Sequence, residues 1–305
     1  MNTLTLNSYA KVNLYLEVLN KRKDACHNIK TLFERIDLCD KMVFKTLRDK
    51  KITVTCDLPS VPRDNSNLAW QAARLLQDTC KSAKGADIRI IKRIPVGSGL
   101  GGGSSNAAST LTGLNKLWGL GLKRVELARL AAKLGSDVPF FIYDTPFAFG
   151  TGRGDKILPL DILDGVKLWH ILVVPKIAVS TPYIYRIWDK KYPKNAIKKE
   201  RARLTTAGYD VNILISGLKR NDVSLTGDLL YNSLEQVAAG AYPRIKHLKD
   251  RLKRLGASAV LMSGSGSAVF ALLSSKKEAL TLYRRLGPTN SWGRVFVSCT
   301  CCARR

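Results

Sequence analysis

The segment that most limits how this chain can fold is a run of small residues from Gly97 to Ala108, which reads GSGLGGGSSNAA. It contains five glycines and three serines, and helical periodicity begins near its end, at Ser105. Glycines let main-chain N–H groups approach a ligand closely, and the start of a helix adds N–H donors and the positive end of its dipole. The run is therefore expected to cradle phosphate groups, with the hydroxyls of Ser104 and Ser105 placed to bind a phosphate oxygen or Mg²⁺.

Two other glycine motifs do not account for this run. Gly97, Gly99 and Gly102 match the spacing of the dinucleotide-binding fingerprint, but that motif needs a βαβ unit and a carboxylate at the end of the second strand. Here the predicted helix leads into another helix, and the first acidic residue beyond it is Glu126. A Walker loop is excluded as well, because no Lys followed by Ser or Thr comes directly after the last glycine. An ordinary glycine-rich loop remains the alternative to a phosphate site.

The spacing of apolar residues predicts a mixture of strands and helices in both halves of the chain. Asn65 or Ser66 is expected to cap a helix that continues to Cys80, and Gly135 is expected to terminate a later one. Because the elements interleave without a regular βαβ order, the predicted fold class is α+β rather than a doubly wound parallel sheet. The predicted strands cover 12–18, 50–55, 88–91 and 171–174. The other predicted helices cover 105–117, 127–134 and 245–255. A strand, a loop and a second strand are predicted over 259–273.

The length of 305 residues favours two domains, since single domains usually hold about 100 to 200 residues. The flexible stretch from Gly150 to Gly154 is the best boundary, and a new apolar strand follows it. The sequence therefore predicts a first domain over 1–154 and a second over 155–305.

The composition argues against a membrane-spanning or exported protein. No run of about 18 apolar residues occurs, and Met1 leads directly into an alternating stretch without the zones of a signal peptide. The seven cysteines form no disulfide framework, and Cys299, Cys301 and Cys302 lack the partners of a zinc site. Free thiols, no metal site and a cytoplasmic location are expected.

The net charge of +26 is the most unusual bulk property. Such a field raises the local concentration of nucleic acids, anionic membranes or phosphorylated substrates. The basic residues are spread over 41–51, 190–203 and 246–254, without one dense block or interleaved aromatics. A generally basic surface is the preferred interpretation, and a nucleic-acid-binding protein remains the alternative from another class.

Three segments together resemble the signatures of the GHMP kinases. Ala10 to Leu14 is similar to the first signature, Pro95 to Ala108 to the second, P-x-x-x-G-L-G-G-G-S-S-N-A-A, and Ser263 to Ser267 to the third. They occur in the family's order and span almost the whole chain. The resemblance implies a two-domain GHMP kinase fold, with a ribosomal-S5-domain-2-like N-terminal domain that binds ATP, a ferredoxin-like C-terminal domain and an active site between them.

Within this superfamily the closest resemblance is to the 4-diphosphocytidyl-2-C-methyl-D-erythritol kinases. The segments that carry it are His27 with its neighbours, Leu134 to Phe140, and Ser180 to Tyr185. The resemblance implies phosphorylation, with ATP and Mg²⁺, of the 2-hydroxyl of a cytidyl diphosphate polyol in non-mevalonate isoprenoid synthesis. A monomer or weak homodimer is expected, without a membrane or a specific nucleic acid as partner. Homoserine, mevalonate or sugar kinases are the runner-up, but their substrates carry no base to recognise.

The resemblance also implies the catalytic and nucleotide-binding residues. Asp137 would be the base that takes the proton of the substrate hydroxyl, and Lys11 would orient this carboxylate and offset the phosphoryl charge. In the alternative interpretation Asp137 only caps the next turn and Lys11 is a solvated strand lysine. The inferred nucleotide site consists of Pro95, Val96, Gly97, Ser98, Gly99, Leu100, Gly101, Gly102, Gly103, Ser104 and Ser105.

The same resemblance assigns the substrate-binding residues. His27 and Tyr185 would hold the cytosine, while Asn13 and Thr181 would contact the polyol or its phosphates. Without the family, His27 would be an inert loop histidine and Tyr185 a core residue. The loop at 263–267 is either a tight hairpin or a second set of N–H donors that closes over phosphates.

One departure from the family pattern concerns the cytosine site. The family reads G-Y-H where this chain reads Ala25-Cys26-His27, so one aromatic ring is missing. A lost base stack corresponds to roughly 1 to 3 kcal/mol. The sequence predicts weak cytidyl binding unless a neighbour such as Tyr183 compensates, and it predicts that Cys26→Tyr tightens that binding.

Overall fold

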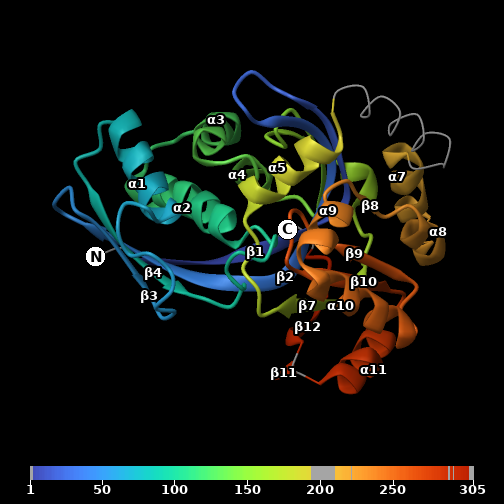
Figure 1. Ribbon diagram of the computed structural model, residues 1–305. Coiled ribbons are helices and arrows are strands. Elements are labelled where there is room, and N and C mark those ends of the chain that lie inside the picture. Colours follow the sequence, from blue (N-terminus) through green and yellow to red (C-terminus); the bar gives the residue numbers. More distant parts are fainter. Residues whose placement is uncertain (1–2, 194–209, 221, 288, 291, 302–305) are drawn as a thin grey trace.

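The computed structural model describes residues 3–193, 210–220, 222–287, 289–290 and 292–301, which form two β-sheets with helices packed on them (Figure 1). Cys302 and most of the predicted basic stretch 190–203 lie outside these residues. The mixed α/β fold with two sheets confirms the predicted α+β class. No helix among the described residues is long and apolar enough to cross a membrane.

The first sheet is built around a long antiparallel hairpin of β1 and β2. The strand order is β3-β4-β2-β1-β8, and β5 and β6 add to the side of β2. Helices α1 to α4 lie together along this half of the molecule (Figure 1). Its elements are β1 (Thr3–Lys21), β2 (His27–Leu47), β3 (Ile52–Cys56), α1 (Leu68–Thr79), β4 (Gly85–Ile91), α2 (Gly102–Trp118), α3 (Arg124–Leu134), α4 (Val138–Tyr143), β5 (Phe147–Thr151), β6 (Lys156–Pro159) and β8 (Tyr231–Asn232).

The second sheet has the order β11-β12-β7-β10-β9, with antiparallel neighbours throughout. Without the short β11, this is the order of a ferredoxin-like unit, in which the first strand lies between the fourth and the third. The predicted ferredoxin-like domain is therefore confirmed. Its elements are η1 (Asp161–Leu163), β7 (Trp169–Pro175), α5 (Thr181–Lys191), α7 (Val211–Lys219), α8 (Val223–Asp228), α9 (Glu235–Ala241), α10 (Pro243–Arg254), β9 (Ala259–Met262), β10 (Val269–Leu273), α11 (Lys276–Leu286), β11 (Thr289–Asn290) and β12 (Gly293–Cys299).

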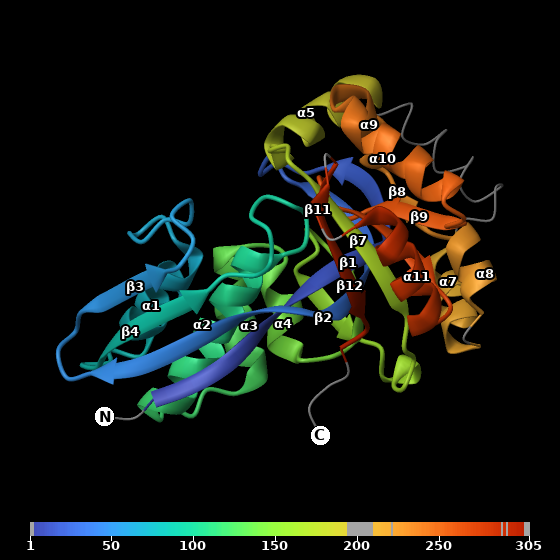
Figure 2. The ribbon, with the colours of Figure 1, turned by 90° about the horizontal axis from the view of Figure 1, so that it is seen from below.

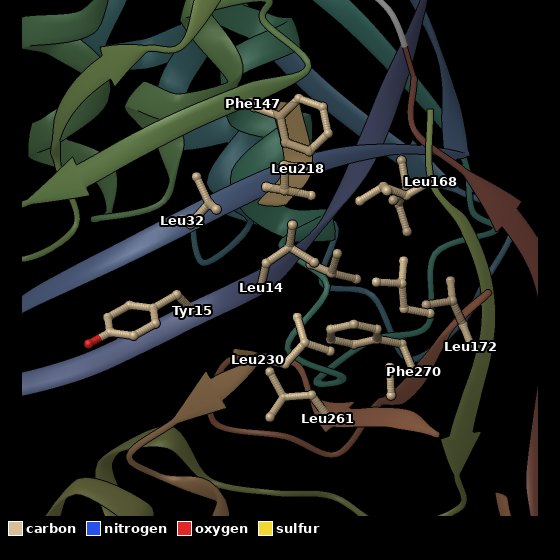
Figure 3. Packing of buried hydrophobic residues seen from close by; sticks show 14 of the residues in the cluster. Leu14, Tyr15, Leu32, Phe147, Leu168, Leu172, Leu218, Leu230, Leu261 and Phe270 are labelled. Carbon is tan, nitrogen blue, oxygen red and sulfur yellow. The ribbon is translucent and has the colours of Figure 1, made fainter. Parts of the chain in front are cut away.

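Strand β7 is apolar on both faces because both faces are covered. Ile171 and Val173 belong to a cluster with the buried residues of α10 and α11. Leu172 and Val174 belong to a second cluster, which Leu14 of β1 also joins (Figure 3). A strand buried on both sides needs a continuous apolar run rather than alternation. The core thus joins the two sheets directly, which fixes the loops between them in place.

The last described residues return to the middle of β2. Thr300 forms a β-bridge with Ile36, and its hydroxyl donates to Glu34 over 2.7 Å. The fully buried His170 of β7 contacts the same carboxylate at 2.9 Å. Cys301 adds a main-chain hydrogen bond to Arg35. The end of the second sheet is therefore fastened to the first.

Two predicted helix starts are wrong. Asn67, rather than Asn65 or Ser66, caps α1, because its side chain accepts a hydrogen bond from the Ala69 N–H at 2.9 Å. Ser66 is still part of a turn, closed by a hydrogen bond from its N–H to the Asp64 carboxylate. Helix α2 begins inside the glycine run instead of at its end.

The other predicted strands and helices are confirmed with end shifts of a few residues, except that the first strand begins at Thr3 rather than at Val12. The domain boundary at 154 stays a prediction. It falls between β5 and β6, two strands that pair within the first sheet.

The turn that joins β1 to β2 contains a strained residue, Ala25, whose φ is 63°. An alanine in this left-handed region costs about 1 to 2 kcal/mol, whereas glycine adopts it freely. We expect Ala25→Gly to raise the free energy of unfolding by about 0.5 to 1 kcal/mol in urea denaturation. Ala128→Gly, inside α3, is the matched control and should lower it by about 1 kcal/mol. A loss of stability in both variants would contradict the strain at Ala25.

Candidate active site

Lys11 and Asp137 meet where strand β1 passes the start of α4. The Nζ atom of Lys11 lies 3.3 Å from the Asp137 carboxylate and 2.6 Å from the Asn13 side-chain oxygen. Lys11 is 3% exposed, so it is not a solvated strand lysine. Asn13 is held in turn by a 2.8 Å hydrogen bond to Thr31. The buried ammonium group of Lys11 is therefore held between two oxygens, which replace contacts with water.

Asp137 occupies the N-cap position of α4 but does not cap it. Its side chain makes no capping hydrogen bond, and its backbone is in the right-handed helical region. Pro139 lies in the first turn of α4, and because proline has no N–H group it needs no capping partner there. The alternative interpretation of Asp137 as a structural cap is therefore wrong. Its carboxylate is about a third exposed and lines a pocket, so it can reach a ligand.

The glycine run forms a tight loop that leads into α2. Gly97, Gly99 and Gly101 all have φ between 63° and 77°. A Cβ on Gly99 would lie 2.3 Å from the main-chain oxygen of Ser263, and one on Gly101 would lie 3.0 Å from Lys11. Gly101 is also the N-cap of α2 and offers no side-chain acceptor. The first N–H groups of α2 are thus directed out of the helix as anion donors.

Other residues of the run hold the loop rather than face a ligand. The Ser98 hydroxyl donates to the Pro95 oxygen at 2.7 Å, and the Leu100 oxygen accepts from the Lys11 N–H at 3.0 Å. Ser105 is buried and its hydroxyl accepts from Ser8 at 2.8 Å. Of the two serines expected to contact phosphate or Mg²⁺, only Ser104 has a side chain at the surface of α2.

A buried carboxylate that the sequence did not single out anchors this loop. Asp40 is fully buried and accepts hydrogen bonds from the N–H groups of Arg93 and Ile94 and from the side chains of Lys92 and Asn106. Four donors on one carboxylate compensate its burial. They tie the segment before the glycines and the first turn of α2 to strand β2.

The loop at 263–267 packs against the glycine loop. The Ser263 hydroxyl donates to the Gly99 oxygen at 3.1 Å, and Ser265 and Thr181 share a 2.6 Å hydrogen bond. Asn232, also missed by the sequence analysis, donates to the main-chain oxygens of Met262 and Gly264, each at 2.8 Å. Because Asn232 pairs with β1, it sets this loop relative to Lys11.

His27 lies at the end of the β1–β2 hairpin, which reaches helix α5 (Figure 1). Its ring stacks on Tyr185 at 4.8 Å and meets the edge of Trp188 at 5.7 Å. Its Nε2 atom lies 2.6 Å from the Asp189 carboxylate, which Lys21 also contacts at 2.6 Å. Burial opposes the ionisation of Asp189, but these two contacts hold its pKa below the ordinary value.

Burial raises the pKa of Tyr185, and the nearby Asp137 carboxylate adds to this effect. The phenol therefore stays neutral. Tyr183 points elsewhere: its ring meets Tyr242 edge-on at 6.4 Å and carries Arg186 on its face. Tyr183 is not placed to replace the ring missing at Cys26.

A pocket of about 210 Å³ brings together eight of the seventeen predicted site residues. A larger hollow of about 580 Å³ lies near α9 and α10, away from the Lys11–Asp137 pair. The smaller pocket contains the pair and is therefore the candidate active site. His27 contacts the lining residue Tyr185 instead of lining the pocket itself. The predicted residues that line the pocket are Lys11, Asn13, Gly97, Gly99, Gly101, Asp137, Thr181 and Tyr185, and Arg153, which was not predicted, joins them.

Comparison with protein families gives two matches along the chain. The model described as GHMP kinases N terminal domain matches residues 67–145, and that described as GHMP kinases C terminal matches residues 214–289. The two matches contain the glycine loop, Asp137 and the loop at 263–267.

Comparison with individual proteins agrees. The chain is 42% identical over 286 residues to 4-diphosphocytidyl-2-C-methyl-D-erythritol kinase of Geobacillus sp. (strain WCH70), covering 93% of this chain and 92% of the relative. The enzyme of the same name from Gloeothece citriformis (strain PCC 7424) is 39% identical, covering 92% and 89%.

Among solved structures, a 4-(cytidine 5'-diphospho)-2C-methyl-D-erythritol kinase superposes with a TM-score of 0.78 at 31% identity, covering 97% of this chain and 98% of that chain. Homoserine kinase from Cytophaga hutchinsonii superposes with a TM-score of 0.76 at 19% identity, covering 100% and 96%, which shows a shared fold only.

Proposed function

Because the chain belongs to the 4-diphosphocytidyl-2-C-methyl-D-erythritol kinase family of the GHMP kinases, we propose that it transfers the γ-phosphoryl group of ATP to the 2-hydroxyl of 4-diphosphocytidyl-2-C-methyl-D-erythritol. The observation that supports this most directly is the Lys11–Asp137 pair, held in a pocket between the glycine loop and Tyr185. The substrate hydroxyl would enter beside Asp137, with the ATP phosphates on the side of Gly99 and Gly101.

The acid–base step follows from this geometry. Asp137 accepts the proton of the attacking hydroxyl as the P–O bond to the leaving ADP breaks. Lys11 lies 3.3 Å from that carboxylate, so it fixes the orientation of Asp137 and offsets negative charge on the transferred group. Asn13 holds the ammonium from the other side, which keeps it aimed at the reacting atoms.

The glycine loop fits a nucleotide polyphosphate. Side chains at Gly99 and Gly101 would fill the space that a close main-chain approach requires. The N–H groups of Gly102, Gly103 and Ser104 at the start of α2 would bind the β- and γ-phosphates. Bound Mg²⁺ would neutralise phosphate charge, and the Ser104 hydroxyl at the start of α2 would be a protein oxygen for it.

The substrate's cytosine would stack on Tyr185, whose other face is covered by His27, and its polyol and diphosphate would lie near Asn13 and Thr181. Tyr185→Ala removes the stacking surface, so we expect KM for the cytidyl substrate to rise about 10-fold, within the roughly 1 to 3 kcal/mol of a base stack. The KM for ATP should not change. Steady-state kinetics with each substrate varied in turn measures both. A Tyr185→Ala enzyme with normal KM would place the cytosine elsewhere.

The function is tested by ADP release with Mg-ATP and a set of acceptors. Turnover with 4-diphosphocytidyl-2-C-methyl-D-erythritol, and none with homoserine, mevalonate or galactose, is the expected result. Preference for one of the other acceptors would leave a GHMP kinase of different specificity. Salt-sensitive retention on a polyanion without ATP turnover would instead favour the nucleic-acid-binding alternative.

A further inference from the structure

The cytosine site lacks an aromatic ring at Cys26, yet it is not empty on that side. Arg153 lies in the turn between β5 and β6 and lines the same pocket as Tyr185 and Asp137. A hydrogen bond to Asp155 raises the pKa of Arg153 against the opposing effect of burial, and the Cys26 side chain adds to the increase. The turn that carries Arg153 is held against the start of β2, because the Ile29 N–H donates to the Gly152 oxygen at 2.7 Å. Arg153 therefore lies near Cys26.

The guanidinium of Arg153 is held in one plane by three hydrogen bonds. Its Nε and Nη2 atoms donate to the Asp155 carboxylate at 3.3 and 3.0 Å, and Nη2 also donates to the Ala132 oxygen at 3.1 Å. The turn itself is fixed, because the Arg153 N–H donates to the same carboxylate at 2.9 Å. A side chain with these contacts keeps its orientation when a ligand enters.

These contacts decide what the guanidinium can offer. A bidentate contact to a phosphate uses two parallel N–H groups, and the pair formed by Nε and Nη2 is already bound to Asp155. The flat face of the group and the two N–H groups of Nη1 are left, and arginine faces stack well on nucleic-acid bases and aromatic rings. The side chain is about a third exposed, so a face is accessible.

We propose that Arg153 provides the second stacking surface of the cytosine site, opposite Tyr185, in place of the ring that is missing at Cys26. The inference rests on the proposed function. His27 covers one face of Tyr185, so a base stacked on that ring uses the other face. The base would then be covered on both faces although the aromatic residue beside His27 is missing, because the planar guanidinium of Arg153 would cover the second face.

The test is calorimetric binding of cytidine and CDP to wild-type protein and variants. Arg153→Ala should weaken both ligands by a similar factor, about 5- to 50-fold, because the lost contact is to the base. Arg153→Lys keeps the charge but not the plane and should not restore binding. Cys26→Tyr should restore most of the affinity in the Arg153→Ala background. The ratio of CDP to UDP affinity should stay constant, since stacking does not distinguish bases.

Arg186→Ala is the matched control, because Arg186 also lies on an aromatic ring but on Tyr183, outside the pocket. It should bind cytidine normally. Normal cytidine binding by Arg153→Ala, with weaker CDP binding that Arg153→Lys restores, would assign Arg153 to the diphosphate and overturn the proposal. Unchanged binding of both ligands would overturn it too. A wild-type protein that phosphorylates another acceptor and binds no cytidine nucleotide would overturn the proposed function itself.

Discussion

Asp137→Asn is expected to lower kcat by about 10² to 10⁴-fold and to leave the affinity for Mg-ATP nearly unchanged. The amide cannot accept a proton from the substrate hydroxyl, whereas it keeps the shape of the carboxylate beside Lys11. The lower end of the range is expected, because a loose phosphoryl-transfer transition state needs little proton removal early in the reaction. Single-turnover kinetics with saturating substrates separates this chemical step from binding.

The control for this variant is Asp161→Asn, which changes an exposed aspartate in η1. It should have wild-type kcat. Thermal unfolding of both variants checks that Asp137→Asn is folded, as we expect from the absence of a capping role. Near-normal turnover of folded Asp137→Asn would remove this carboxylate from the mechanism.

Gly101→Val is expected to weaken Mg-ATP binding at least about 10-fold and to lower kcat as well. Gly101 has φ of 72°, a conformation that costs other residues about 1 to 2 kcal/mol, and more when they are β-branched. The new Cβ would also lie 3.0 Å from both Lys11 and Phe141. The substitution therefore disturbs the glycine loop and the proposed catalytic lysine together. Calorimetry with a nonhydrolysable ATP analogue measures the first effect.

Gly119→Val separates strain from function. Gly119 ends α2 with φ of 70°, and a Cβ there meets nothing within 4 Å. This variant should lose a similar amount of stability while it binds the ATP analogue normally. If Gly101→Val also binds the analogue normally, the glycine run serves the turn and not the phosphates.

The sequence predicted best those parts of the site that depend on local backbone requirements. Glycines in the left-handed region at every second position leave a clear pattern, and the burial of both faces of β7 leaves an apolar run. Lys11 and Asp137 came from the family resemblance, because neither residue has a local signal. In the structure the two side chains meet in one pocket, which supports the roles proposed for them.

The residues that were missed act over long sequence separations. Asp40 binds Ile94 and Asn106, which lie 54 and 66 residues away, and Asn232 binds the loop at 262–264. A single aspartate in a strand has no feature that reveals such partners. Asn67 was missed for another reason: three polar residues in succession could each cap α1, and the turn at Asp64 decides among them.

The attachment of Thr300 to strand β2 has a consequence for synthesis on the ribosome. Glu34 emerges 266 residues before Thr300, whose hydroxyl donates a hydrogen bond to the Glu34 carboxylate. His170, which contacts the same carboxylate, also emerges much later than Glu34. Until then the Glu34 carboxylate, which is fully buried in the folded protein, lacks these two partners. Contacts between residues so far apart in the sequence slow folding, and they prolong the time during which unpaired strand edges are exposed. The packing of the two sheets therefore cannot be completed before Thr300 has emerged, 266 residues after Glu34.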